Sequence, residues 1–311
     1  MILPVPSPLP LPDFVSRRID DAAGELLRPE GPYAEIDFTE PSGEEALVPP
    51  DSLSWRLFKN PVSLFIGGVA AVILELAEPG VRTGVWEHSS FRKDPVTRLR
   101  RTGLAAMVTV YGAKSVSEAM IAGVVRRHDK VTGQTPDGQA YRANDPDLLD
   151  WVQATASFGF AEAYSCYVRP LDGDALDRVY GEAEPAARLY GAVGSPRSQA
   201  EMAALFNRME ARLEASPIVF EFLDIMRAAP ALPGPMAVSQ PLLIRAAVEM
   251  VPGWVRERLG LGEAHGLKPW ETAMVRQAGR FSDSILIRSS PAVQACRRLG
   301  LPDDYLYRPT S

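Results

Sequence analysis

The amino-acid sequence predicts an all-α fold, and three observations support this prediction. Most segments repeat apolar residues at helical spacing, whereas few alternate apolar and polar residues with the period of two that strands show. Several of these segments begin with a helix-capping residue, often followed by proline. Proline and glycine clusters such as "APALPGP" at residues 229–235 separate the segments. We therefore expect one multi-helix domain with a globin-like helical core over residues 14–311.

Capping patterns locate the helices along the chain. Asp94 followed by Pro95 opens "DPVTRLRRTGLAAMVTVYG", and Asp145 opens "DPDLLDWVQATASFGFAEAYSCYV" in the same way. Ser115 and Glu118 form a capping-box pattern at the start of "SVSEAMIAGVVRRH". A further amphipathic helix runs through "SPRSQAEMAALFNRMEARLEAS", and helices are also expected at 14–27, 51–58, 172–192, 217–228, 238–250 and 268–282.

The most apolar run, "PVSLFIGGVAAVILELA" at residues 61–77, predicts a buried central helix. Its uncharged part, from Pro61 to Leu74, is 14 residues long. This is shorter than the about 20 residues that a membrane-spanning helix needs, so we expect no transmembrane segment here. The Gly67–Gly68 pair is expected to mark the close approach of another backbone or of a flat ligand.

Two segments are expected to be non-helical. Residues 1–13, at the start of "MILPVPSPLPLPDFVSRR", contain five prolines and predict an extended arm on the protein surface. Arg17–Arg18 follow the apolar part instead of preceding it, which is the reverse of an export signal, so we expect a cytoplasmic protein. Pro136-Asp137-Gly138, within "VTGQTPDGQAYRA", predicts a turn that closes a short hairpin or loop insert near residues 132–143.

The composition narrows the classes of function. Hydrophobic residues make up 46% of the chain and charged residues 23%, which is typical of a globular protein. The net charge of −6 argues against a nucleic-acid binder and against a polybasic membrane-binding surface. Cys166 and Cys296 give neither zinc spacing nor a disulfide framework. Two buried thiols are expected, with a single bridge between them as the alternative.

The first candidate ligand is His128, in "AMIAGVVRRHDKVTG". Ile121, Val124, Val125 and His128 are spaced i, i+3, i+4 and i+7, so the imidazole lies at the end of one apolar helix face. The hypothesis of a ligand role competes with the simpler interpretation of a core histidine whose ring nitrogens are satisfied.

The preceding helix adds a second candidate group. Arg98 and Thr102 are four residues apart and share one face with the small residues Ala105, Ala106 and Thr109. Small side chains leave room for a bulky ligand, and a guanidinium grips carboxylates. A flat apolar macrocycle that carries two carboxylates and an iron in need of an imidazole would satisfy both helices. The alternative is that Arg98 and Arg101 form a solvated helix face.

Two blocks carry a resemblance to a known family. The chain from Asn60 to Thr102 reads "NPVSLFIGGVAAVILELAEPGVRTGVWEHSSFRKDPVTRLRRT", and Val124 to Thr155 reads "VVRRHDKVTGQTPDGQAYRANDPDLLDWVQAT". Both resemble the catalytic domain of the rubber oxygenase and MpaB oxygenase family, the DUF2236 group. The resemblance extends from about Ser54 to Pro302, and the "DPVTRLRRT" and "HDKVTG…YRANDP…WV" motifs carry it together.

The resemblance implies cofactor and site residues. Latex-clearing members of the family hold b-type haem through a proximal histidine, which corresponds to His128. The family's R-x-x-[K/R]-T pattern, which lines the haem pocket, corresponds to Arg98, Arg101 and Thr102. The expected function is therefore that of an oxidoreductase: a haem b-dependent oxygenase that uses dioxygen on an apolar, alkene-bearing small molecule or isoprenoid.

Further residues are candidates with open roles. His88 is expected either on the distal side of the haem, as a sixth ligand or as a donor to dioxygen, or as an ordinary loop residue. Rubber oxygenases use a glutamate to remove a substrate proton, and Glu75 and Glu87 are the candidates. Lys59 is a candidate for the family's distal lysine or else a solvated helix end.

Three alternative functions compete with this one. The first is a haem-binding sensor or carrier without turnover. The second is a non-haem iron enzyme built from His88, His128 and a carboxylate. The third is a haem-free helical protein that shares the fold, because a fold does not determine a chemistry.

Overall fold

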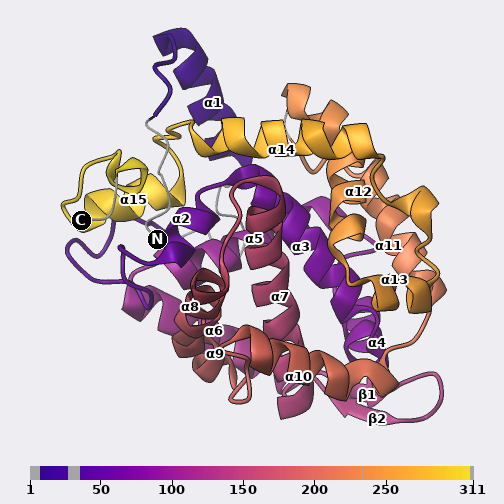
Figure 1. The fold of residues 1–311 in the computed structure, drawn as a ribbon. Coiled ribbons are helices and arrows are strands. Elements are labelled where there is room, and N and C mark those ends of the chain that lie inside the picture. The colour runs from indigo at the N-terminus through magenta and orange to yellow at the C-terminus, as the bar shows by residue number, and fades with distance from the viewer. Residues whose placement is uncertain (1–7, 27–35, 233, 309–311) are drawn as a thin grey trace.

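The computed structural model describes residues 8–26, 36–232 and 234–308, and it is 66% helical with a single small sheet, which confirms the all-α fold (Figure 1). The helices of the first half are α1 Asp13–Leu26, α2 Leu53–Phe58, α3 Pro61–Glu75, α4 Pro79–His88, α5 Pro95–Tyr111, α6 Lys114–His128 and α7 Pro146–Tyr167. Those of the second half are α8 Gly173–Glu182, α9 Glu184–Tyr190, α10 Gln199–Met209, α11 Pro217–Ala228, α12 Gln240–Met250, α13 Gly253–Leu259, α14 Pro269–Asp283 and α15 Pro291–Arg298. Short 3₁₀ turns occur at Glu210–Arg212, Gly234–Ser239, Glu263–His265 and Tyr305–Tyr307.

Helices α3 and α7 form the most extensive helix pair and lie side by side through the middle of the molecule (Figure 1). Two glycines allow their backbones to touch, since a Cβ on Gly67 would lie 2.6 Å from the carbonyl oxygen of Gly159. Gly68 differs, because a Cβ there would meet only Cε1 of Phe160, at 3.9 Å. Of the two expectations for the glycine pair, the approach of another backbone is confirmed at Gly67.

The described residues form two large hydrophobic cores, and the pair belongs to the larger one. The larger one unites α3 and α7 with the helices of the second half, and the smaller one lies between α2, α5, α6 and α15. Each core contains a fully buried tryptophan whose indole N–H donates to a backbone carbonyl: Trp55 to Val48 at 2.9 Å, and Trp151 to Leu74 at 3.2 Å.

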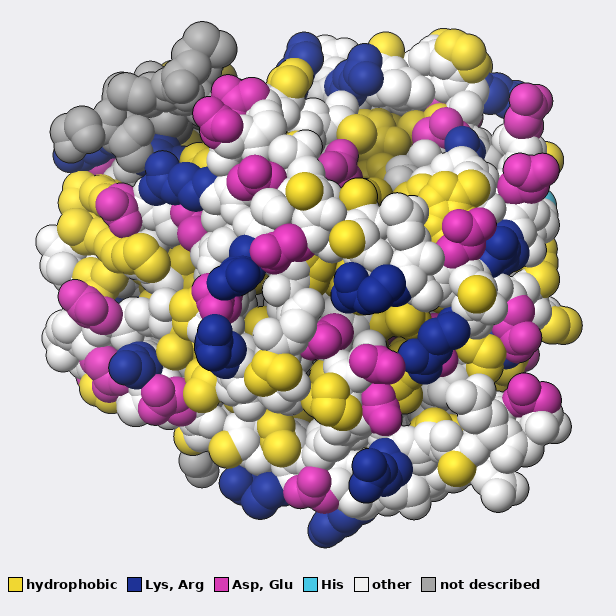
Figure 2. All heavy atoms as spheres, turned by 60° about the horizontal axis from the view of Figure 1, so that its bottom comes forward, with side chains coloured by type: hydrophobic (Ala, Val, Ile, Leu, Met, Phe, Trp, Pro, Cys, Tyr) yellow, Lys and Arg dark blue, Asp and Glu magenta, His cyan; other side chains and the backbone are white. Residues whose placement is uncertain are grey.

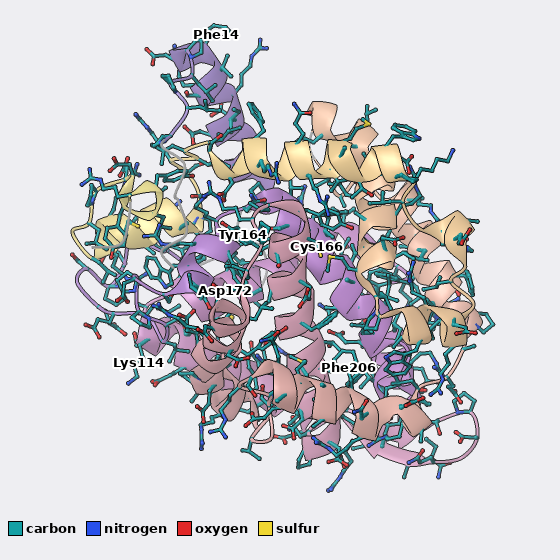
Figure 3. The ribbon with its side chains drawn as sticks, viewed as in Figure 1. Phe14, Lys114, Tyr164, Cys166, Asp172 and Phe206 are labelled. Carbon is teal, nitrogen blue, oxygen red and sulfur yellow. The ribbon has the colours of Figure 1, made fainter. Side chains whose placement is uncertain are left out.

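A buried ion cluster connects α2, α7 and α14. The ammonium of Lys59 donates to the carboxylate of Asp283 at 2.5 Å, and both side chains are almost completely buried. Asp283 also accepts from Arg169 at 3.2 Å and from the hydroxyl of Tyr164 at 3.4 Å, and Tyr164 lies on α7 in the middle of the molecule (Figure 3). The interpretation of Lys59 as a solvated helix end is therefore wrong: it ends α2, but within an ion pair.

Most predicted helix starts are confirmed. Asp94 caps α5 by accepting from the N–H of Thr97, and Asp145 caps α7 by accepting from that of Asp147. The capping box at Ser115 is wrong, because α6 begins at Lys114 without a side-chain cap. The backbone N–H and the hydroxyl of Ser115 bind the carboxylate of Glu44 instead.

Other boundaries differ from the prediction for local reasons. The helix expected at 172–192 is divided into α8 and α9, because Pro185 lies in the first turn of α9 and has no N–H to continue a helix. Helix α4 was not expected, although Glu78 caps it by accepting from the N–H of Val81 and Pro79 lies in its first turn. Helices α13 and α15 were likewise not expected.

The predicted hairpin is confirmed, whereas the extended arm stays a prediction. Strands β1 Thr132–Gln134 and β2 Ala140–Arg142 form an antiparallel hairpin in which Gly133 pairs with Tyr141. Of the predicted arm, residues 1–7 lie outside the described residues, and residues 8–12 have no helix or strand. The backbone N–H of Leu9 donates to the carbonyl of Ser284 at 2.9 Å. Both cysteines are free thiols, but only Cys296 is buried, so the expectation of burial is wrong for Cys166.

Within the described ranges, no single helix is both long and apolar enough to cross a membrane. Helices α3 and α4 meet the length and hydropathy requirements only as a pair, and this pair is bent by 111°.

Candidate functional site

The imidazole of His128 lies at the C-terminal end of α6 and is half-buried. Its Nδ1 atom is buried without a hydrogen-bond partner among the described residues. Burial lowers the pKa of His128, and the nearby guanidinium groups of Arg127 and Arg98 lower it further, while the side chain of Asn144 and the carboxylate of Asp129 raise it. The neutral imidazole, which is the metal-binding form, is therefore favoured.

Asn144 follows β2, and its side chain lies close enough to the imidazole of His128 to raise the pKa of the ring. Its amide group donates to the carbonyl of Val125 at 3.2 Å and to the carboxylate of Asp129 at 2.7 Å. The amide oxygen, Oδ1, is buried without a partner in the described part of the chain. Two unpaired polar atoms, an imidazole nitrogen and an amide oxygen, thus occur on adjacent side chains.

The guanidinium of Arg98 acts electrostatically on two titratable side chains, those of His128 and Glu75. It lies in the first half of α5, is half-buried, and lowers the pKa of both His128 and Glu75. One guanidinium therefore acts on the last residue of α3 and on the last residue of α6. Arg98 and His128 are thus close enough to interact electrostatically, and the same holds for Arg98 and Glu75.

Glu75 is the second titratable group of the site. Burial raises its pKa to about 7, against the opposing effect of Arg98. The side chain is nevertheless still partly accessible.

Partly accessible positions occur on the three helices that carry Glu75, Arg98 and His128. On α3, the positions Phe65, Gly68, Val72 and Glu75 recur at intervals of three and four residues and keep part of their surface accessible, although most of the helix is buried. On α5 these positions are Arg98, Ala105 and Thr109, and on α6 they are Val124, Val125 and His128. The lining is therefore apolar or small, apart from the guanidinium, the carboxyl, a hydroxyl and the imidazole.

A separate pocket has a different character. It has a volume of about 350 Å³, lies between α9 and α10, and is lined by charged side chains that include Arg188, Arg208 and Glu201. The face that carries these helices shows basic and acidic side chains intermingled (Figure 2). None of His128, Arg98 and Glu75 lines this pocket.

Among the described residues, the other predicted site residues, Thr102, Arg101 and His88, have no interaction with the side chains of His128 and Glu75. Thr102 is exposed on α5, and its hydroxyl donates to the carbonyl of Arg98 at 2.9 Å. Arg101 is half-buried, with an Nε atom that is buried and unpaired among the described residues. His88 is exposed at the end of α4, and neither it nor Arg101 is among the groups that act on His128 or Glu75.

The structure distinguishes the two candidate glutamates. Glu87 is exposed, and its charge raises the pKa of Tyr141 instead. Glu75 alone acts together with Arg98. The sequence offered no signal for Asn144, because an asparagine before a capping aspartate reads as an ordinary loop residue.

Metal ligation here would depend on one imidazole. In the described ranges, no group of three or more His, Cys, Asp or Glu side chains is arranged to hold a metal ion. The triad of His88, His128 and a carboxylate that a non-haem iron site requires is therefore not assembled among these residues.

Comparison with known proteins identifies the domain. The family model described as "ER-bound oxygenase mpaB/B'/Rubber oxygenase, catalytic domain" matches residues 55–283. The searches of curated proteins and of solved structures gave no match. The matched range is well over half of the chain and contains Glu75, Arg98, His128 and Asn144. The chain belongs to the mpaB and rubber oxygenase catalytic-domain family.

Proposed function

We propose that this oxygenase-family protein is a haem b-dependent oxygenase that acts on an apolar, alkene-bearing substrate. One observation carries the proposal: Arg98 acts electrostatically on both the half-buried imidazole of His128, whose pKa is lowered by burial, and the carboxyl group of Glu75, whose pKa is raised by burial. His128, Arg98 and Glu75 come from three different helices, so a site that they form would depend on the fold and not on a local loop.

The residues present fit a haem. His128 has an unpaired, buried Nδ1 and would bind the haem iron through its other ring nitrogen, Nε2. Arg98 supplies a cation for the propionate carboxylates, and the apolar positions of α3 and α6 suit the faces of the macrocycle. When bound, the haem iron would supply the activation of dioxygen, which side chains do not provide.

Glu75 is proposed as the proton acceptor for the substrate. A general base works best when its pKa lies near the operating pH, and burial raises the pKa of Glu75 to about 7. Arg98 stabilises the carboxylate form before the proton is taken up. The neighbouring accessible positions on the α3 face, Phe65, Gly68 and Val72, offer no other side chain that could accept the proton.

The substrate class follows from the lining and from the family. Phe65, Val72, Val124 and Val125 offer apolar contacts without hydrogen-bonding groups, which suits a hydrocarbon chain. Rubber oxygenase, named in the family description, acts on a polymer of isoprene units. An isoprenoid with several double bonds is therefore the first substrate to test.

Activity can be measured with haem-reconstituted protein, dioxygen and a polyunsaturated isoprenoid, with mass spectrometry of the products. We expect oxygenated products from the wild type, none from His128→Ala, and wild-type activity from His265→Ala, a remote half-buried histidine. Glu75→Gln should bind haem normally but lose most of the activity. Equal activity of His128→Ala and the wild type would contradict the proposal.

A further inference from the structure

We propose that Asn144 is a positioning residue for His128: its amide oxygen accepts the Nδ1–H proton and so leaves Nε2 free as the ligand atom. The assignment of the hydrogen bond is independent of any cofactor. Its consequence for haem rests on the function proposed above.

The orientation of the Asn144 amide is determined by its other contacts. Both donors of the NH₂ group are used, one on the carbonyl of Val125 and one on the carboxylate of Asp129. The oxygen must therefore face away from these two acceptors, and it is buried without a partner among the described residues. A reversed amide would set its oxygen against two other oxygens.

The imidazole supplies the missing donor. The side chain of Asn144 lies within reach of the ring, and Nδ1 of His128 is likewise buried and unpaired in the described structure. A neutral imidazole carries one donor and one acceptor nitrogen. A small rotation of the ring closes an Nδ1–H···Oδ1 hydrogen bond and satisfies both atoms, whose burial otherwise costs free energy.

This contact places the lone pair on Nε2. Histidines that bind metals commonly donate their other ring N–H to an oxygen, which fixes the tautomer and the ring orientation. Here the oxygen is held rigidly, because Asn144 is tied both to the last turn of α6 and, through its place before Asp145, to the start of α7. Backbone pairing between Ala143 and Val131, at 2.9 Å, holds the same loop.

The competing interpretation is purely structural: Asn144 joins the loop to α6 and does nothing to the imidazole. Two variants separate these interpretations. Asn144→Leu removes the amide oxygen and both N–H donors. Asp129→Ala removes only the shorter of the two hydrogen bonds that the amide donates and leaves the amide oxygen in place. The structural interpretation predicts similar effects of the two substitutions on the ring.

The first measurement is the tautomer of His128 in ¹⁵N-labelled, haem-free protein at alkaline pH, read from the ring-nitrogen chemical shifts. We expect Nδ1–H in the wild type and in Asp129→Ala, and a shift towards the Nε2–H form in Asn144→Leu. A predominant Nε2–H tautomer in the wild type would overturn the proposal even if the leucine variant does not fold.

The second measurement is the rate of haem transfer from the loaded protein to apomyoglobin. Loss of such a supporting contact commonly weakens metal binding by roughly 10–100-fold, so Asn144→Leu should release haem faster by about that factor. Asp129→Ala should stay close to the wild type. Equal acceleration in both variants would overturn the proposal. If the wild type takes up no haem, the proposed function fails, but the tautomer measurement still decides the role of Asn144.

Discussion

His128 and Glu75 are of opposite chemical type, yet burial drives both towards the neutral form. Desolvation disfavours any charge, so it lowers the pKa of an imidazole and raises that of a carboxyl. Arg98 lowers the pKa of both groups. Near neutral pH the guanidinium of Arg98 is consequently the dominant charge among these three groups, which suits a ligand that carries carboxylates.

Substitution of Glu75 by glutamine should change how stability depends on pH. Between pH 4.5 and about 7 the unfolded chain releases the Glu75 proton while the folded protein retains it, so the wild type loses stability as the pH rises. Glu75→Gln lacks this loss. Urea unfolding of haem-free protein should show the variant gaining stability relative to the wild type across this window and keeping the gain at higher pH. A difference that does not vary with pH would contradict the assignment, and Glu87→Gln, at an exposed position, is the matched control.

Removal of the Arg98 charge should raise two pKa values together. Because the guanidinium lowers the pKa of both His128 and Glu75, Arg98→Met should raise the pKa of the imidazole and of the carboxyl. NMR titration of haem-free protein measures both. Arg126→Met, which removes an exposed cation close to His128, is the control and should change neither pKa as much. An unchanged pKa of His128 in Arg98→Met would show that the two residues do not interact, and it would contradict the prediction.

At this scale, the sequence pointed to some of the residues of the candidate site. Helical spacing placed Arg98 on a face with small residues and His128 at the end of an apolar stripe, because both patterns are local. The choice between Glu75 and Glu87 was not accessible to the same reasoning. It depends on the 111° bend between α3 and α4, which leaves Glu75 beside Arg98 while Glu87 is exposed.

At the scale of elements, the contact between α3 and α7 depends on glycine. A methyl group at residue 67 would lie 2.6 Å from the carbonyl oxygen of Gly159, on a backbone that cannot move aside cheaply. The same methyl group at residue 68 would have only a phenyl edge at 3.9 Å. A side chain is therefore excluded at residue 67 but fits at residue 68.

Alanine at these two positions should have opposite effects. Gly67→Ala should lower the free energy of unfolding by about 1–3 kcal/mol or more, because the two helices are forced apart. Gly68→Ala should leave it unchanged or raise it by up to about 1 kcal/mol, since alanine favours the helix. Chemical denaturation of both variants measures the difference. Equal stabilities would show that the helices do not touch at Gly67.

The helix boundaries illustrate what local sequence determines. The starts of α5, α7 and α11 follow from a capping side chain and a proline in the first turn, and both signals lie in the local sequence. The start of α6 differs from the predicted one because of a contact that is distant in the sequence. The carboxylate of Glu44, seventy-one residues before Ser115, accepts hydrogen bonds from the backbone N–H and the hydroxyl of Ser115, so these groups are not used in a local capping box. No local pattern reports such a contact.

At the scale of the whole molecule, described segments before and after the matched range of 55–283 pack against the catalytic domain. Arg298 donates to the carbonyl oxygens of Phe38, Glu44 and Tyr111, and Arg56 donates to that of Leu306. These contacts bring residues beyond the matched range of 55–283 onto the smaller core. The candidate site residues lie inside the matched range, whereas the described residues outside it contribute to the packing of the smaller core.

The buried cluster around Asp283 should contribute strongly to global stability. Asp283→Leu leaves the cations of Lys59 and Arg169 without their carboxylate, and breaking such a pair commonly costs about 3–5 kcal/mol. Asp303→Leu, which breaks a partly exposed pair with Arg297, should cost at most about 1 kcal/mol. Thermal and urea unfolding compare the two. Similar losses would show that the buried pair is not a main connection between α2, α7 and α14.

The most direct test of the central claim is a titration of haem-free protein with haem, followed in the Soret region. The account predicts saturation at one haem per chain, with a spectrum typical of an axial histidine. It also predicts that His128→Ala fails to bind haem while its far-ultraviolet circular dichroism remains helical, and that His265→Ala binds like the wild type. Haem binding by His128→Ala with the affinity and spectrum of the wild type would contradict the account.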